Sequence, residues 1–262
     1  NIPASVTTIK GYYDDLACEH YGAFANCTSL TAVTFAQGSQ LQYIYEGAFY
    51  NCDGLTEIEI PASVQVLSYG AYGYAEEWLG SFAACSNLTK VTFAEGSQLT
   101  RIGHTTFAGC SSLTEIILPE GLIYIEDGAF ANCTSLTEII IPASVEKLEN
   151  LDGWIGTFSY CTNLTKVTFA ENSQLTTIGS EAFYNCTSLT EIIIPASVTS
   201  IEWYAFEGCT NLTSVTFENK TGWMVGTYGD ECNITAEQLT DPANAATLLT
   251  DTYLDYDWDR SE

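Results

Sequence analysis

Basic side chains are scarce in this sequence. Only 7 of its 262 residues are Lys or Arg, against 33 Asp and Glu, so the formal net charge is −26. Proteins that bind a nucleic-acid backbone or an anionic membrane surface need clustered Lys and Arg, so we expect neither partner. The acidity favours solubility and permits a basic protein partner.

Several signatures of chemistry and targeting are also missing. The chain has 2 His and no Cys-x-x-Cys pair, so we expect no metal site with converging ligands. Gly-x-Ser-x-Gly, His-Glu-x-x-His and phosphate-binding Gly-Lys loops do not occur, and the sequence predicts neither a cofactor nor an enzyme. No apolar run approaches the roughly 20 residues that span a bilayer, and no signal-peptide pattern opens the chain. We therefore expect no direct membrane insertion in this segment.

One motif, Phe-x-x-Cys, occurs eight times. Successive cysteines are 23 to 33 residues apart, mostly within the range of about 20 to 29 residues of leucine-rich repeats. After each Cys comes Leu-x-x-Val/Ile-x-Phe/Ile/Leu, which predicts a short strand whose first, fourth and sixth residues turn inward. A Pro-Ala-Ser-Val turn follows, or an Ala-x-x-Ser-Gln-Leu turn that is two residues longer. A second apolar pair then leads to the next Phe-x-x-Cys turn, where we expect a short helical or 3₁₀ segment.

These units predict the fold, because one unit cannot bury its apolar face alone whereas stacked units share a continuous core. We predict an α/β leucine-rich-repeat solenoid, right-handed, with short parallel strands and short helical or 3₁₀ turns. The solenoid covers residues 1–217, with eight Phe-x-x-Cys units and a final strand, and residues 218–262 form a C-terminal capping segment. We number the units by their Phe residues, which are Phe24, Phe49, Phe82, Phe107, Phe130, Phe158, Phe183 and Phe206.

The capping segment contains two predicted elements. Asp241 is suited to the N-cap of a helix and Pro242 to its first position. Residues 253–259 predict an amphipathic strand, with Tyr256 and Trp258 packed on the last unit and the acids turned outward. Such a strand would close the open end of the solenoid.

Residues 189–209, LTEIIIPASVTSIEWYAFEGC, closely resemble the treponemal-type leucine-rich repeat of BspA-like bacterial surface proteins. The resemblance covers residues 1 to about 217, and residues 219–258 resemble the capping segment of such proteins. It implies a secreted or surface-attached bacterial protein that binds host or microbial partners, without catalysis. The chain opens inside a repeat, with residues 2–6 matching residues 194–198, and we interpret it as a piece of a longer protein.

The cysteines invite a disulfide interpretation, but their spacing favours free thiols. Equivalent residues of stacked strands lie about 4.7 to 4.9 Å apart, so eight cysteines should form one buried row. The Cβ atoms of such parallel neighbours do not converge as a disulfide requires, and free Cys packs well as a small hydrophobe. Cys18 and Cys232 fall outside the row, and the alternatives are local pairs of Cys18 with Cys27 or of Cys232 with Cys209.

Three units are longer than the others, and the extra residues enter at the same point. Insertions of ten, ten and five residues follow Ile9, Leu67 and Leu148, so they leave the solenoid along one edge. They are rich in Tyr, Trp, Gly and acids, a composition typical of recognition loops. The alternative is that the aromatic rings fold back over the edge of the core. The candidate ligand-binding residues of this insert edge are Tyr12, Tyr13, Tyr69, Tyr72, Tyr74, Trp78 and Trp154.

The outward residues of the predicted strands form a second candidate surface. Glu beside Lys is ordinary stabilisation between strands, and outward Ile and Thr suit strands in any case. The sequence shows no concentrated chemistry there.

We therefore expect an extracellular recognition or adhesion module, secreted or on a bacterial cell surface. Its partner would be a protein, of the extracellular matrix or another cell surface, bound through the insert edge or the strand face. One alternative is a glycan-binding module in which Tyr69, Tyr72, Trp78 and Trp154 stack on sugar rings. The other is a purely structural surface spacer.

Overall fold

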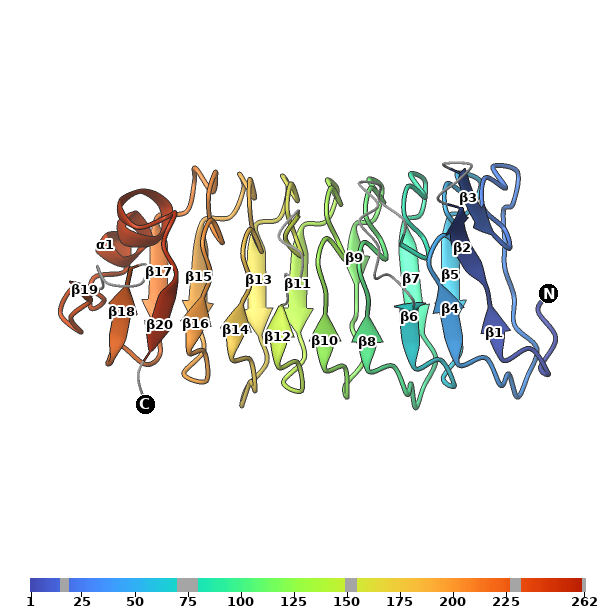
Figure 1. The fold of residues 1–262 in the computed structure, drawn as a ribbon, viewed down its shortest axis with the longest axis horizontal. Coiled ribbons are helices and arrows are strands. Elements are labelled where there is room, and N and C mark those ends of the chain that lie inside the picture. Colours follow the sequence, from blue (N-terminus) through green and yellow to red (C-terminus); the bar gives the residue numbers. More distant parts are fainter. Residues whose placement is uncertain (15–18, 70–79, 149–154, 227–231, 261–262) are drawn as a thin grey trace.

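The repeats stack into one long solenoid with the two termini at opposite ends (Figure 1). The structure, a computed structural model, describes residues 1–14, 19–69, 80–148, 155–226 and 232–260. Most turns of the coil contribute one strand to each of two faces. The leucine-rich-repeat solenoid predicted from the sequence is confirmed.

One face carries the strands that follow each Phe-x-x-Cys-x-x-Leu. They are parallel and form three groups, β5-β7-β9, β11-β13 and β15-β17. In β15, Ile192 and Ile194 are buried whereas Glu191 and Ile193 are exposed, so the predicted alternation is confirmed. The strands are β5 (Glu57–Ile60), β7 (Lys90–Phe93), β9 (Glu115–Ile116), β11 (Glu138–Ile141), β13 (Lys166–Phe169), β15 (Glu191–Ile194) and β17 (Ser214–Phe217).

The second face is one continuous sheet built from the second apolar pair of each unit. Its strands are two to four residues long and parallel, in the order β1-β4-β6-β8-β10-β12-β14-β16. The sequence analysis described these segments only as apolar pairs, because two residues are too few to show a strand period. The strands are β1 (Thr8–Ile9), β4 (Tyr43–Tyr45), β6 (Val66–Tyr69), β8 (Arg101–Ile102), β10 (Tyr124–Ile125), β12 (Lys147–Leu148), β14 (Thr177–Ile178) and β16 (Ser200–Ile201).

Tight turns join the two faces on the Phe-x-x-Cys side, which we call the turn side. In the seventh unit the Tyr184 N–H donates to the Glu181 carbonyl three residues earlier (2.9 Å), the 3₁₀ pattern. The Phe183 N–H instead donates to the Ala205 carbonyl of the next unit (2.8 Å). Glu181 has a φ of 56°, which interrupts a helical run. The 3₁₀ bonds are therefore present, but in the described units they do not join into a continuous helix.

The repeated Phe and Cys form two rows inside the turn side. Phe rings of neighbouring units stack with centroids 5.0 to 5.6 Å apart, from Phe24 to Phe206, within the usual range for offset rings. The Cys133 thiol donates to the Phe107 carbonyl (3.3 Å), and six other cysteines make the same bond to the preceding unit. The sequence analysis missed this bond, because spacing identifies a small buried residue but not what its thiol contacts.

The first unit departs from the predicted cysteine row. Seven of the register cysteines are buried, but Cys27 is exposed, because it is first in the stack and has a neighbouring unit on one side only. The prediction of eight buried thiols is therefore wrong at Cys27. Cys209 and Cys232 are both free, so that alternative pair is not formed. Cys27 is free as well, and Cys18 lies outside the described residues.

The C-terminal segment closes the last unit by adding strands to the second face. β20 (Trp258–Arg260) pairs antiparallel with β16, and β18 (Trp223–Val225) and β19 (Cys232–Asn233) extend the sheet beyond it. Trp223 and Trp258 are both 1% exposed and pack against Phe217. Burial of two indole rings there removes the open apolar end that a solenoid would otherwise expose.

The helix of this segment begins as predicted, but the terminal strand is shorter than expected. The Asp241 carboxylate accepts a hydrogen bond from the Ala243 N–H (3.0 Å) at the start of α1 (Pro242–Thr247). A wider helical turn, η1 (Leu248–Thr252), follows, and the strand begins only at Trp258. Asp257, expected to face outward, accepts a hydrogen bond from the Trp203 N–H (2.9 Å). Packing on the last unit overrides the alternating pattern here.

Candidate functional site

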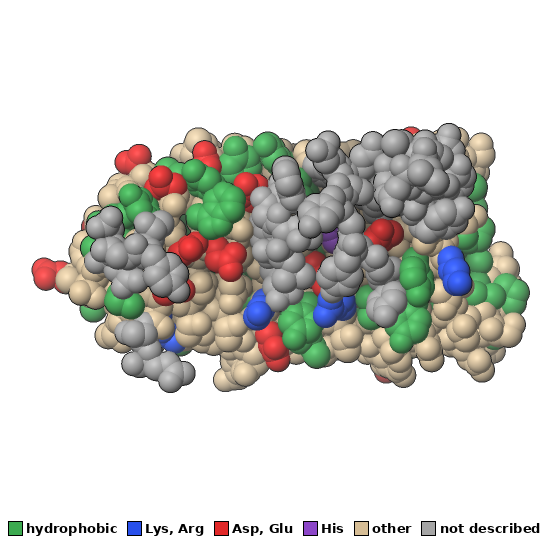
Figure 2. Space-filling model, in the orientation of Figure 1, with side chains coloured by type: hydrophobic (Ala, Val, Ile, Leu, Met, Phe, Trp, Pro, Cys, Tyr) green, Lys and Arg blue, Asp and Glu red, His purple; other side chains and the backbone are tan. Residues whose placement is uncertain are grey.

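Cationic and metal-ligating side chains do not gather into a site in the described residues. Figure 2 shows few Lys and Arg among the Asp and Glu of one face. Arg101 is engaged within the protein, where it forms an ion pair with Glu126 and lies over the Tyr124 ring, 5.0 Å from its centroid. In the described ranges no group of three or more His, Cys, Asp or Glu could hold a metal ion. No helix among them is long and apolar enough to cross a membrane.

The strand face is defined here as the outward side chains of β5, β7, β9, β11, β13, β15 and β17, together with Ile117, which follows β9. Its first column mixes charges of both signs, with Lys90 directly opposite Glu115, a pairing that stabilises the sheet. Its second column contains three isoleucines in solvent, with exposed fractions of 83% for Ile117, 61% for Ile140 and 56% for Ile193. Such side chains contribute little to the core, and a row of them is a candidate contact surface.

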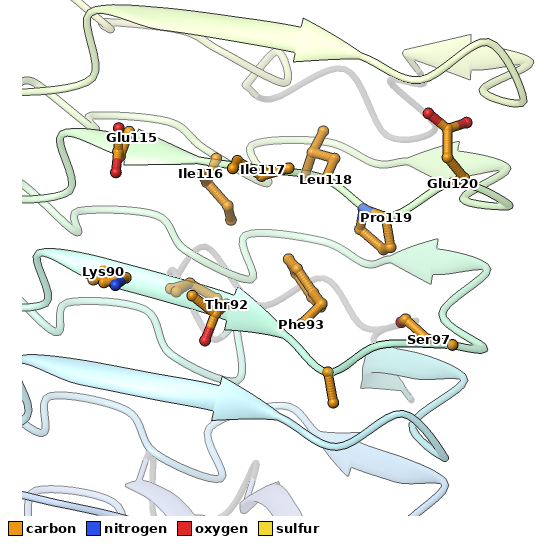
Figure 3. A pocket seen from close by; sticks show the side chains of 13 residues that line it. Lys90, Thr92, Phe93, Ser97, Glu115, Ile116, Ile117, Leu118, Pro119 and Glu120 are labelled. Atoms are coloured by element: carbon orange, nitrogen blue, oxygen red, sulfur yellow. The ribbon is translucent and has the colours of Figure 1, made fainter.

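Two grooves hollow the strand face. The first, of about 440 Å³, lies between β7 and β9, with Phe93, Ile117 and Pro119 in its wall and Lys90 and Ser97 at its polar parts (Figure 3). The two-residue β9 ends its pairing with β7 before Ile117. The second groove, of about 800 Å³, lies between β5 and the first unit. Both grooves border one of the longer Ala-x-x-Ser-Gln-Leu turns, but the turn alone does not locate them, because each groove depends on how two units meet.

The structure places only part of the predicted insert edge. Tyr12 and Tyr13 lie on β2 (Gly11–Asp14), which pairs antiparallel with β3 (Glu19–Gly22) in a hairpin. Tyr69 is the last residue of β6, opposite Tyr45 of β4. The side chains of Tyr12, Tyr13 and Tyr69 are not described, and Tyr72, Tyr74, Trp78 and Trp154 lie outside the described residues. Whether these seven residues form one binding surface therefore stays a prediction.

Each insert returns to the solenoid through a glycine two residues before the Phe of its unit. A Cβ at Gly22, Gly80 or Gly156 would lie 1.8, 1.8 or 1.9 Å from a backbone carbonyl oxygen of the next unit. Only glycine allows so close an approach, so the return points are fixed by backbone contact. The sequence analysis overlooked this signal, although Gly stands at the same place in all three inserts.

Buried hydroxyl groups anchor both ends of the second insert. The Ser68 N–H donates to Ser81 Oγ (2.7 Å), and the Ser81 N–H donates to Ser68 Oγ (2.8 Å). Thr106 Oγ1 donates to Ser68 Oγ (2.9 Å), and all three side chains are buried. A fully bonded buried network of this kind is rigid, so the insert leaves and re-enters the solenoid at a fixed anchor.

Stacked parallel strands, a Phe row and units of 23 to 33 residues define the class of leucine-rich-repeat solenoids. Within that class, the family described as BspA type Leucine rich repeat region (6 copies) matches residues 1–78, 79–174 and 155–240. The chain belongs to this family. No curated protein sequence matches the chain.

Several solved bacterial structures are similar to this chain. A leucine rich cell surface protein of Faecalibacterium prausnitzii A2-165 is 30% identical over 74% of this chain and 47% of its own, with a TM-score of 0.57. The chain thus spans about half the length of that protein. The leucine rich repeat protein of T. pallidum is 22% identical over 80% of each chain, with a TM-score of 0.46. The pneumococcal vaccine antigen PcpA is 18% identical over 84% of this chain and 68% of its own, with a TM-score of 0.32.

Proposed function

We propose that this chain is an extracellular recognition module, carried by a bacterial cell-surface protein, that binds a protein partner through its strand face. The observation that carries the proposal is the column of solvent-exposed Ile117, Ile140 and Ile193, interrupted by Thr168, with an open groove beside Ile117. The family and the F. prausnitzii cell surface protein support the location. Repeat solenoids commonly offer such extended faces for binding.

The chemistry of the strand face favours a protein over a sugar. Isoleucine side chains gain free energy when a partner covers them, at about 25 cal/mol per Å² of apolar surface. They have no aromatic ring to stack on a sugar and no hydrogen-bonding group. Glu115 and Glu138 lie two residues before Ile117 and Ile140, and Lys90 lies opposite Glu115 on the neighbouring strand. An apolar centre with a charged rim is the usual anatomy of a protein interface.

The insert edge is the second surface of this proposal, with Tyr12, Tyr13, Tyr69, Tyr72, Tyr74, Trp78 and Trp154 as its candidate contacts. Fixed anchors at Gly22, Gly80 and Gly156 support it, because a loop held at its base loses less entropy on binding.

An array of purified extracellular-matrix proteins and glycans, probed with the chain and its variants, tests the proposal. The strand-face variant is Ile117→Thr/Ile140→Thr/Ile193→Thr. It keeps the fold because Thr occupies the same column in β7, β13 and β17. We expect it to bind a protein ligand about tenfold more weakly or worse, since a few central side chains dominate most interfaces.

The matched comparison is Tyr72→Ala/Trp78→Ala on the insert edge. Loss of binding in this variant alone would move the site from the strand face to the insert edge. Binding only to glycans would replace the protein partner with a sugar. Absence of any binding by the unaltered chain would contradict the recognition role.

A further inference from the structure

Two pairs of aromatic side chains lie on the turn side of the sixth to eighth units. Tyr160 and Trp203 are 39% and 36% exposed, and Tyr184 and Tyr204 are half-buried. The Tyr160 and Tyr184 rings meet edge to face with centroids 5.3 Å apart. The Trp203 and Tyr204 rings do the same at 5.0 Å. Aromatic rings left in solvent on consecutive units are not explained by the core, which the Phe row already fills.

Two of these residues are held in a backbone conformation that their side chains disfavour. Tyr160 and Tyr204 have φ values of 61° and 58°, in the left-handed region that bulky residues rarely adopt. The residue equivalent to Tyr160 is Asn in four other units, at positions 26, 51, 132 and 185. Asn adopts this conformation more readily. The fold alone therefore favours Asn at this position, and strain of this kind is concentrated at functional sites.

Two carboxylates accompany the rings. The pKa of Tyr184 is raised by Tyr160 and then by Glu207, and the pKa of Glu181 is raised by burial and then by Glu207. Backbone hydrogen bonds place both carboxylate residues beside the aromatic ones: the Glu181 N–H donates to the Trp203 carbonyl (3.3 Å), and the Asn185 N–H, next to Tyr184, donates to the Glu207 carbonyl (2.7 Å). In the described part of these three units the basic residues are Lys147, on the second face, and Lys166, on the strand face. The aromatic–carboxylate patch consists of Tyr160, Glu181, Tyr184, Trp203, Tyr204 and Glu207.

Figure 2, drawn in the orientation of Figure 1, shows hydrophobic and acidic side chains side by side. They lie above the region where Figure 1 labels β14 and β16. No described Lys or Arg lies among them in that part of the view. The C-terminal cap fixes the backbone at one end of the patch. The Trp203 N–H donates to Asp257 Oδ1 (2.9 Å), and the Tyr204 N–H donates to the Leu254 carbonyl (2.6 Å). The patch is therefore preorganised before any ligand arrives.

We propose that the aromatic–carboxylate patch binds Lys and Arg side chains of a basic protein segment. The faces of Tyr and Trp rings attract cations, and a carboxylate beside them accepts charge-assisted hydrogen bonds. The net charge of −26 draws a basic partner toward the surface and repels an acidic one. The patch lies on the turn side, so it acts separately from the strand face.

The experiment uses a fluorescently labelled hexapeptide of alternating Lys and Arg, titrated with the whole chain at physiological salt and followed by anisotropy. The test variant is Tyr160→Asn/Trp203→Ser, which places in the patch the residues that Asn185 and Ser180 supply in the seventh unit. We expect it to bind about tenfold more weakly, since two cation–π contacts are removed. Tyr160→Asn alone should keep or raise the Tm, because Asn relieves the strained backbone.

Glu57→Gln/Glu59→Gln on the strand face is the control, because it removes two charges from a surface separate from the aromatic–carboxylate patch. We expect this control to change the affinity less than twofold, and the triple Ile→Thr variant to bind the peptide as the unaltered chain does. An equal loss in the patch variant and the Glu control would show nonspecific attraction and overturn the proposal. The proposal would also be overturned if the patch variant lost no affinity for the peptide, or if the unaltered chain bound neutral oligosaccharides and not the peptide.

Discussion

The same ten residues, GAFANCTSLT, occur at 22–31 in the first unit and at 128–137 in the fifth. In the fifth unit Phe130 and Cys133 are fully buried, and the Cys133 thiol donates to the carbonyl of the unit before it. In the first unit Phe24 is half-buried and Cys27 is exposed. The same ten residues are therefore buried in one unit and partly exposed in the other, because packing against neighbouring units, and not the local sequence, determines burial.

The first residue of these two segments is glycine for two different reasons. Gly128 has a φ of 58° and lies within the tight turn that the Ala129 N–H closes by donating to the Glu126 carbonyl (3.1 Å). Gly22 is the last residue of β3 in the β2–β3 hairpin, and a Cβ there would lie 1.8 Å from the Gly47 carbonyl oxygen. The insert before Gly22 changes the path of the chain, and glycine accommodates both paths.

Replacing the paired phenylalanines gives the largest expected contrast. Phe130→Ala should lower the free energy of unfolding by about 3 to 5 kcal/mol, since a ring packed on both sides leaves a cavity. Phe24→Ala should cost about 1 to 2 kcal/mol, because Phe24 is half-buried and, among the described side chains, stacks on Phe49 alone. Urea denaturation followed by circular dichroism measures both. Equal losses of unfolding free energy in the two variants would show that the local motif determines burial.

The paired cysteines should differ in the same direction by a smaller amount. Cys133→Ala removes a buried thiol and its hydrogen bond, and should cost about 1 to 2 kcal/mol. Cys27→Ala removes an exposed thiol, and should change the free energy of unfolding by less than about 0.5 kcal/mol. The same urea titration applies. A Cys27 variant as unstable as the Cys133 variant would contradict the exposure of the first unit.

Glu46, in the second unit, gives a pH-dependent contrast beside the insert of the first unit. It is next to the base of the hairpin, where a Cβ on Gly11 would meet the Glu46 carbonyl oxygen, and burial raises its pKa from 4.5 to about 7. The folded state therefore holds the proton more tightly than the unfolded chain does, and stability falls as the pH rises from 4.5 through about 7.

Glu46→Gln should remove this loss of stability at higher pH, since the amide of Gln carries no charge. At pH 8 we expect the variant to be more stable by about 1 to 2 kcal/mol, a value reduced because the carboxyl is partly exposed. At pH 4.5 the gain should vanish. Thermal unfolding at pH 4.5 and at pH 8 measures this gain in stability, with the exposed Glu59→Gln as the charge-matched control. A gain that is the same at both pH values would contradict the raised pKa.

Much of the fold follows from the sequence because the repeat itself encodes it. The spacing of Phe, Cys and Leu predicted the stacked units, and Asp241 and Pro242 predicted the start of the helix. The thiol bonds to Phe carbonyls and the groove beside Phe93 were not predictable, because each depends on how two units meet. The strand that starts at Trp258 is short for a similar reason, since its neighbours in the last unit decide where it begins.

The candidate surfaces were predicted less completely than the fold. The sequence identified Ile117 as outward-facing but gave no sign of a groove beside it. In the sequence, nothing distinguishes Tyr160 and Trp203 from other residues of a repeat. Only their exposure and the left-handed backbone at Tyr160 single them out. Surfaces made by residues from different units become visible only when the units are stacked.

Native-state alkylation of Cys27 and Cys133 tests most directly whether neighbouring units, and not local sequence, decide the environment of each residue. The flanking residues are identical, so the two thiols should react at similar rates in the unfolded chain. Burial raises the pKa of Cys133 well above its usual range, and the buried thiol is unreactive as well as inaccessible. Mass spectrometry after brief iodoacetamide treatment should show Cys27 labelled and Cys133 protected by about a hundredfold or more. Equal labelling of the two cysteines in the folded protein would contradict the account.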